Sequence, residues 1–183
     1  MKTSVWRFGH GPIVGALAFL AGCAGARHEE AVPPPASIAA TYGVEVEFGV
    51  QRVRAAAAGF ADLDSAVAAG YERAVTRCYA DAHHGAMGFH HRKRALMDDH
   101  IEPEQPEILL YERLDNGHYR LNGVEYIVPY TRWSPDSTAP TVFGQRLKRA
   151  DDLRVWYLHA WVWRENTAGL FADWNPAVHC PAG

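Results

Sequence analysis

Residues 108–128 read ILLYERLDNGHYRLNGVEYIV. Two runs rich in aliphatic and aromatic side chains, residues 108–111 and 119–128, lie on either side of Asn116 and Gly117. An Asn-Gly pair between two such runs is a strong signal of a β-hairpin, because both residues tolerate the positive φ that a tight turn requires. We therefore predict two antiparallel strands here.

A third strand is expected further along the chain, and helices are expected before the hairpin. Residues 155–163 (VWYLHAWVW) form another apolar and aromatic run of strand length. In residues 44–60 apolar side chains recur every three or four positions, which is the spacing of one helix face. This periodicity predicts a helix over the whole of that segment.

Two shorter helical pieces are expected after this helix. The first covers residues 65–69, with Asp62 or Asp64 as its N-cap and Gly70 at its end. The second covers residues 71–79.

The remaining segments are expected to be irregular. Residues 83–91 (HHGAMGFHH) predict a histidine-rich loop because glycine recurs in them, and prolines and a tryptophan predict a loop at 129–140. The fold class is therefore α+β, with N-terminal helices packed on a small antiparallel β-sheet and a long C-terminal coil.

The first 23 residues have the layout of an export signal. Lys2 and Arg7 provide a positively charged start, and an apolar stretch follows at residues 13–20. That stretch is much shorter than the roughly 20 residues of a membrane-spanning helix. It ends in LAGC, which looks like a lipobox, so we predict a lipoprotein signal peptide over residues 1–23 with a lipidated Cys23.

A tether and a single domain are expected after this signal. Residues 24–42 contain three consecutive prolines and few side chains that could pack, which predicts a flexible Pro-rich tether. Residues 43–183 have the length of a single globular domain. Because Ala24 is no inner-membrane retention signal, we expect an exported protein anchored by lipid to the outer membrane and facing the periplasm. The alternative is an ordinary secretory signal cleaved after residues 24–26 (AGA).

The charge of the chain excludes a basic nucleic-acid-binding protein. The 183 residues include 18 Lys and Arg and 21 Asp and Glu, a formal net charge of -3. Without Lys2 and Arg7 the mature chain has 16 basic and 21 acidic residues, or -5. Nucleic-acid binding normally needs a basic surface, so we expect no such partner.

Two cysteines remain besides the lipidated one. Cys78 and Cys180 form an even pair, and in an oxidising compartment such a pair predicts a disulfide. The alternative is a metal site that combines both thiolates with His83, His84 or His179. The spacing matches no zinc knuckle, so the disulfide is the preferred interpretation.

Two carboxylates and one imidazole are expected to point from the sheet into aromatic surroundings. Side chains alternate between the two faces of a strand, and Glu112, Glu125 and His159 each share a face with apolar neighbours. Such groups are costly to bury without partners. A divalent transition metal held by His90, Glu112, Glu125 and His159 would satisfy all of them. The alternative is a metal-free polar network, such as a hydrogen-bonded Glu-His pair.

Three functions are compatible with these features. The first is a cell-envelope lipoprotein without an assigned biochemical activity, which binds a metal or small ligand in a His/Glu/aromatic pocket. The second is a hydrolase-like, metal-dependent envelope enzyme, in which Glu112 or Glu125 is the general base and a metal-bound water the nucleophile. The third is a module that docks on an envelope protein through a tryptophan-rich face.

Several segments resemble an uncharacterised family of exported bacterial proteins. They are GAMGFH (85–90), PEILLYE (106–112), VEY (124–126), PTVFGQ (140–145), LHAW (158–161) and NPAVHC (175–180). The similarity spans about residues 55–180. The family has no established activity, so the resemblance implies one folded unit and no particular function.

Overall fold

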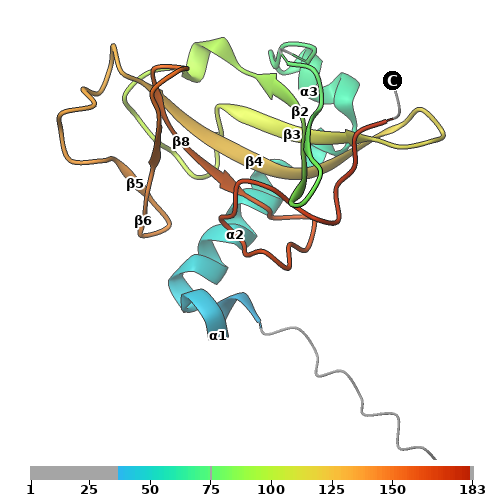
Figure 1. Cartoon of the computed structure of the whole chain (residues 1–183), viewed down its shortest axis with the longest axis horizontal. Coiled ribbons are helices and arrows are strands. Elements are labelled where there is room, and N and C mark those ends of the chain that lie inside the picture. Colours follow the sequence, from blue (N-terminus) through green and yellow to red (C-terminus); the bar gives the residue numbers. More distant parts are fainter. Residues whose placement is uncertain (1–36, 75, 182–183) are drawn as a thin grey trace, which may run out of the picture. The chain divides into compact units, whose positions relative to one another are not determined.

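The computed structural model of the protein describes residues 37–74 and 76–181. These residues form a curled, six-stranded antiparallel sheet with a few short helices (Figure 1). In their order across the sheet, the strands are β1 (Tyr79–Asp81), β2 (Gly85–Arg92), β3 (Ile108–Arg113), β4 (Tyr119–Pro129), β8 (Val155–Ala160) and β7 (Lys148–Ala150). The described part is thus a mixed helix-and-sheet fold in which the sheet predominates.

The hairpin predicted around Asn116 and Gly117 is confirmed and forms the centre of the sheet. Strands β3 and β4 pair in antiparallel fashion. The backbone N–H of Leu114 donates to the carbonyl of His118 at 2.8 Å, which closes the turn. Gly117 has φ of 82°, a conformation that glycine adopts without steric cost.

The third predicted strand is also present, as β8, but it is shorter than expected. It ends at Ala160 because the N–H of Trp161 donates to the carbonyl of Leu170 and no longer to β4. β7 and a separate two-stranded sheet, β5 (Thr141–Val142) with β6 (Gln145–Arg146), lie in a segment for which no strand was predicted.

Two of the helices predicted before the sheet are present. α2 (Val44–Ala56) is followed by a short 3₁₀ helix, η1 (Ala58–Ala61), so the predicted helix of residues 44–60 is divided into two. α3 (Leu63–Ala68) is capped by Asp62, whose carboxylate accepts from the N–H of Ser65 at 3.1 Å.

The predicted tether ends before residue 42. Ser37 caps α1 (Ile38–Tyr42), and the Tyr42 ring packs edge-on against Phe171. The Tyr42 hydroxyl also accepts from the N–H of Leu170 at 3.0 Å. These contacts tie the segment to the domain.

The helix predicted at residues 71–79 is wrong. The described residues of this segment contain no helix. The hydroxyl of Tyr71 donates to the carbonyl of Pro106, and the N–H of Glu72 donates to the carbonyl of Arg92, both at 2.7 Å. These contacts with distant parts of the chain replace the local hydrogen bonds of a helix.

The loop predicted at residues 83–91 is also wrong, because most of it is strand β2. Gly88 has φ of 88°, and a Cβ at this position would lie 2.4 Å from the carbonyl oxygen of Tyr111. Gly85 makes a similar close approach to the backbone of Asn175. The glycines therefore permit close packing of neighbouring segments here, which is a second role of glycine within a strand.

The two faces of the sheet carry different layers. Val124, Tyr126 and Val128 of β4 belong to the main core together with Val50 and Val53 of α2. The other face contributes to a smaller apolar cluster: Ala86, Ile108, Leu110, Ile127, Trp161 and Val178. The helix thus covers one face, and residues from the C-terminal segment pack on the other.

The predicted disulfide between Cys78 and Cys180 is present, with the two Cα atoms 5.6 Å apart. It attaches the C-terminal segment to the chain just before β1. Because the two sulfurs are bonded to each other, the alternative thiolate metal site with His83, His84 or His179 is wrong.

The predicted signal peptide, the lipidated Cys23 and residues 24–36 of the tether lie outside the described residues. Among the residues that the structure describes, no helix has the length and apolar character needed to cross a bilayer.

Candidate metal site

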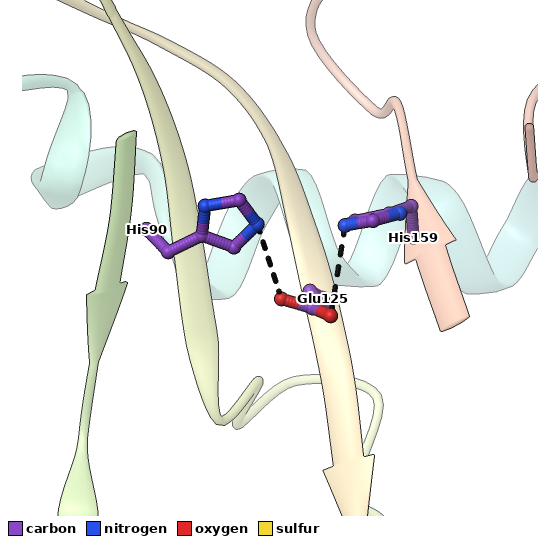
Figure 2. A group of neighbouring side chains, drawn as sticks. All are labelled: His90, Glu125 and His159. Atoms are coloured by element: carbon purple, nitrogen blue, oxygen red, sulfur yellow. Dashed lines mark ion pairs between the residues drawn. The ribbon is translucent and has the colours of Figure 1, made fainter. Parts of the chain in front are cut away.

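Three of the four predicted metal ligands converge on one face of the sheet: His90, Glu125 and His159 (Figure 2). They come from β2, β4 and β8 respectively. Figure 2 shows both imidazole rings directed towards the Glu125 carboxylate, with a helix behind the strands. One donor atom from each residue lies within 4.8 Å of the other two.

Strand register explains this convergence. Glu125 of β4 lies directly opposite His159 of β8 and opposite Ile108 of β3. Ile108 in turn faces Arg92 of β2, and His90 is two residues away from Arg92 on the same face. His90 therefore approaches Glu125 diagonally across β3.

The distances within this group exceed those of hydrogen bonds. Nε2 of His90 lies 3.5 Å from Oε2 of Glu125, and Nε2 of His159 lies 3.6 Å from Oε1. An N–H···O hydrogen bond spans about 2.7–3.2 Å. Two ligand atoms that are each about 2.1 Å from one tetrahedral metal ion lie roughly 3.4 Å apart. The observed separations are each close to this second value, and each histidine faces a different oxygen of the carboxylate.

All three side chains are buried, and Glu125 and His159 have polar atoms without partners. Oε2 of Glu125 and both ring nitrogens of His159 make no hydrogen bond within the described part of the chain. His90, Glu125 and His159 are 7%, 6% and 1% exposed. A buried polar atom without a partner is costly and usually indicates a function or a bound group.

The protonation states of this group are shifted by burial. Burial, together with the neighbouring imidazoles of His159 and His91, lowers the pKa of His90 to about 3. A neutral imidazole is the form that binds a metal. Burial also raises the pKa of Glu125, against a smaller opposite effect of His159.

Glu112, the fourth predicted ligand, lies away from this group. It shares the face of Ile108 and Leu110, but it is four residues along β3 from Ile108, about 13 Å at 3.3 Å per residue. Its carboxylate pairs with Arg120 at 2.5 Å and accepts from the N–H of His179 at 3.0 Å. The alternation of side chains along the strand predicted the face of Glu112 correctly. It could not predict the distance between Glu112 and Glu125.

A second layer of polar residues contacts the two histidines. The hydroxyl of Thr76 lies 3.2 Å from Nδ1 of His90. Oδ1 of Asp173 lies 3.8 Å from Nδ1 of His159 and accepts from Nζ of Lys148 at 2.6 Å. Burial favours a higher pKa for Asp173, but His159 and Lys148 outweigh it and lower this pKa to about 2. Asp173 is therefore ionised beside His159.

Sequence reasoning did not assign Thr76, Lys148 or Asp173 to this site. They lie in segments without a motif, and only long-range packing brings them to the histidines. No local signal could have identified them.

A pocket of about 550 Å³ opens onto the three candidate ligands. Its walls are mostly apolar or aromatic and include Met87, Met97, Ile108, Ile127, Tyr157 and Trp174. The volume lies in the range of small-molecule sites. A metal held by three protein ligands would have a remaining coordination position beside this space.

Comparison of the chain with known protein families, with curated proteins and with solved structures gave no match. The resemblance to a family of exported bacterial proteins therefore remains a prediction, and the function has to be inferred from the geometry of the site.

Proposed function

We propose that the protein binds a divalent transition metal ion through His90, Glu125 and His159. One observation carries this proposal: three buried donor side chains converge with one ligand atom from each within 4.8 Å of the others, and each imidazole lies beyond hydrogen-bond length from the Glu125 carboxylate. An ion would provide the partner that Oε2 of Glu125 and the ring of His159 lack.

The donor set limits the metals that fit. Two imidazole nitrogens and one carboxylate are the ligands of several zinc enzymes and of non-haem iron(II) sites. The hard ions Ca²⁺ and Mg²⁺ prefer oxygen ligands and are disfavoured by the two histidines. We therefore expect zinc or iron(II) in preference to calcium or magnesium.

The competing explanation is a metal-free polar network. In that case Glu125 would be hydrogen-bonded to His90 or His159. The separations of 3.5 and 3.6 Å argue against direct hydrogen bonds. A metal-free network would need water to bridge these atoms, and metal analysis distinguishes it from a bound ion.

The decisive experiment is metal analysis of the untagged protein, produced as the full chain with export into an oxidising compartment. We expect one equivalent of zinc or iron, and at most a small fraction of it in His159→Ala or Glu125→Gln. The matched control is His118→Ala, because His118 is exposed and belongs to the hairpin turn. Metal-free parent protein that also fails to bind added Zn²⁺ would contradict the proposal.

We also propose that this domain is attached to the cell envelope through a lipid on Cys23. The lipobox-like LAGC sequence supports this location. The disulfide between Cys78 and Cys180 agrees with an oxidising compartment. Labelling of the parent protein with radioactive palmitate, and loss of the label in Cys23→Ser, would test it; an unlabelled parent would contradict it.

The two other predicted functions have less support. The hydrolase interpretation needs a general base, but Glu112 is paired with Arg120 and Glu125 is required as a ligand. The docking interpretation needs an exposed tryptophan-rich face, and every tryptophan in the described residues is buried or half-buried.

A further inference from the structure

We infer that the pocket beside His90, Glu125 and His159 binds a small organic carboxylate whose apolar body lies against the pocket wall and whose head group coordinates the metal. This inference rests on the proposed metal site and adds the class of its ligand. Three features of the pocket carry it: its charge, its wall and its polar rim.

The charge of the occupied site favours an anion. A divalent ion with two neutral imidazoles and the Glu125 carboxylate has a net charge of +1 in a buried position. Charge interactions are stronger there than in water. An anionic fourth ligand would neutralise the site, so a carboxylate is preferred over an alcohol or an amine.

The wall favours an apolar ligand body. Ile108 and Ile127 are buried side chains of the sheet, and Tyr157 and Trp174 are half-buried aromatic residues. Met87 and Met97 also line the space, and their flexible side chains can adapt to ligands of different shape. Burial of alkyl groups against such a wall is favourable.

The rim does not offer the polar groups that a sugar or a nucleotide would require. Nε and one terminal nitrogen of Arg92 donate to Glu72, at 3.1 and 2.8 Å. The Thr76 hydroxyl is in contact with His90. Arg92 is already paired with Glu72, so the metal would be the main anchor for an anionic head group in the described pocket.

The test uses the full-length protein loaded with Co²⁺, whose visible absorption reports the metal and its fourth ligand. We would titrate it with hexanoate, acetate and hexanol. We expect hexanoate to change the cobalt spectrum with a dissociation constant at least tenfold lower than that of acetate. Hexanol, which has the alkyl chain without the anion, should leave the spectrum unchanged.

A variant of the pocket wall provides a second readout. Met97→Asp places a negative charge in the half-buried wall and should weaken hexanoate binding at least tenfold, with Co²⁺ still bound. Val44→Asp is the matched control, because Val44 is 58% exposed on α2 and is not a pocket residue. It should bind hexanoate like the parent.

The outcomes separate the two proposals. Failure to bind Co²⁺ would overturn the metal site and the ligand class together. Stoichiometric Co²⁺ with equal dissociation constants for hexanoate and acetate, or with no spectral change, would overturn the ligand class and leave the metal site in place. An equal response to hexanol and hexanoate would show that the anion is not the anchor.

Discussion

Glu125 and His159 are direct partners in the ladder between β4 and β8, and their side chains lie on the same face with Oε1 and Nε2 3.6 Å apart. Two interior strands of the sheet fix this pair, so neither side chain can move far away without disturbing the sheet. The protein thus holds a carboxylate and an imidazole close together in a buried place, which costs folding free energy unless another group compensates.

This cost predicts that the order of stability of Glu125→Gln and the parent protein depends on whether metal is present. Burial raises the pKa of Glu125 because the charged form is poorly solvated. Without metal, we expect the variant to be more stable than the parent by about 1 kcal/mol, since an amide carries no charge. With Zn²⁺ the order should reverse, because metal binding stabilises only the parent. Urea unfolding with EDTA and with Zn²⁺ measures both values. A metal-free variant that is less stable than the parent would indicate a hydrogen-bonded Glu-His network.

Asp173 is expected to orient His159. Its carboxylate is held by Lys148 at 2.6 Å and lies 3.8 Å from Nδ1 of His159. Carboxylates behind a metal-bound histidine typically contribute a 10–100-fold effect on metal affinity. We expect Asp173→Asn to lower Zn²⁺ affinity by such a factor in a competition titration. Asp151→Asn, an exposed aspartate paired with Arg149, is the control; equal affinities in all three proteins would rule out this role.

Glu107 should make stability depend on pH. Burial raises its pKa to about 8, and its carboxyl accepts from the N–H of Ile127 at 3.1 Å. The ordinary pKa of a glutamate is 4.5, so between pH 4.5 and about 8 the folded protein keeps a proton that the unfolded chain releases. The free energy of unfolding should therefore fall as pH rises through this range, by at most about 1.4 kcal/mol per pH unit, and level off above it.

Glu107→Gln should remove this contribution and be more stable than the parent at pH 7. The amide oxygen can still accept the hydrogen bond from Ile127. Denaturant unfolding at several pH values measures the slopes, with exposed Glu102→Gln as the control that keeps the parental slope. Identical slopes for Glu107→Gln and the parent would show that Glu107 is ionised in the fold.

The disulfide should contribute strongly to stability. It joins residues separated by 102 positions, and closure of a loop of about 100 residues is worth about 4–5 kcal/mol when the loss of chain entropy in the unfolded state is counted. We expect the double variant Cys78→Ser/Cys180→Ser to lose this amount in urea unfolding. A reductant should destabilise the parent and have no effect on the variant. A loss below about 1 kcal/mol would show that packing alone holds the C-terminal segment.

Two glycines with similar backbone angles should respond differently to alanine. Gly88 and Gly117 have φ of 88° and 82°, but only at Gly88 would a Cβ meet another atom, the carbonyl oxygen of Tyr111 at 2.4 Å. We expect Gly117→Ala to cost about 1–2 kcal/mol from backbone strain alone. Gly88→Ala should cost at least about 3 kcal/mol, because strain and a clash inside the sheet add together. Equal losses in thermal or urea unfolding would contradict the close approach of β2 to β3 at Gly88.

Several features of the fold could be predicted because their causes are local. Asn116 and Gly117 allow the tight turn of the central hairpin, and Asp62 can cap only the helix that begins next to it. The two-residue period placed Glu125 and His159 on buried faces of their strands. The disulfide followed from the count of cysteines and the expected compartment.

Other features depend on contacts between residues far apart in the chain. Strand β2 was mistaken for a loop because glycine there serves close packing against Tyr111 and Asn175, which a local pattern cannot indicate. The helix predicted at residues 71–79 is absent because this segment makes hydrogen bonds with Pro106 and Arg92 instead.

The sequence by itself determined the faces on which Glu125 and His159 lie, because alternation is a property of a single strand. Tertiary structure alone decided the distances between strands: it brought His90 diagonally across β3 to Glu125 and left Glu112 four residues away beside Arg120. It also brought Asp173 of the C-terminal segment to His159. The register of the strands and the position of the C-terminal segment depend on the packing of the whole sheet. No short stretch of sequence contains that information.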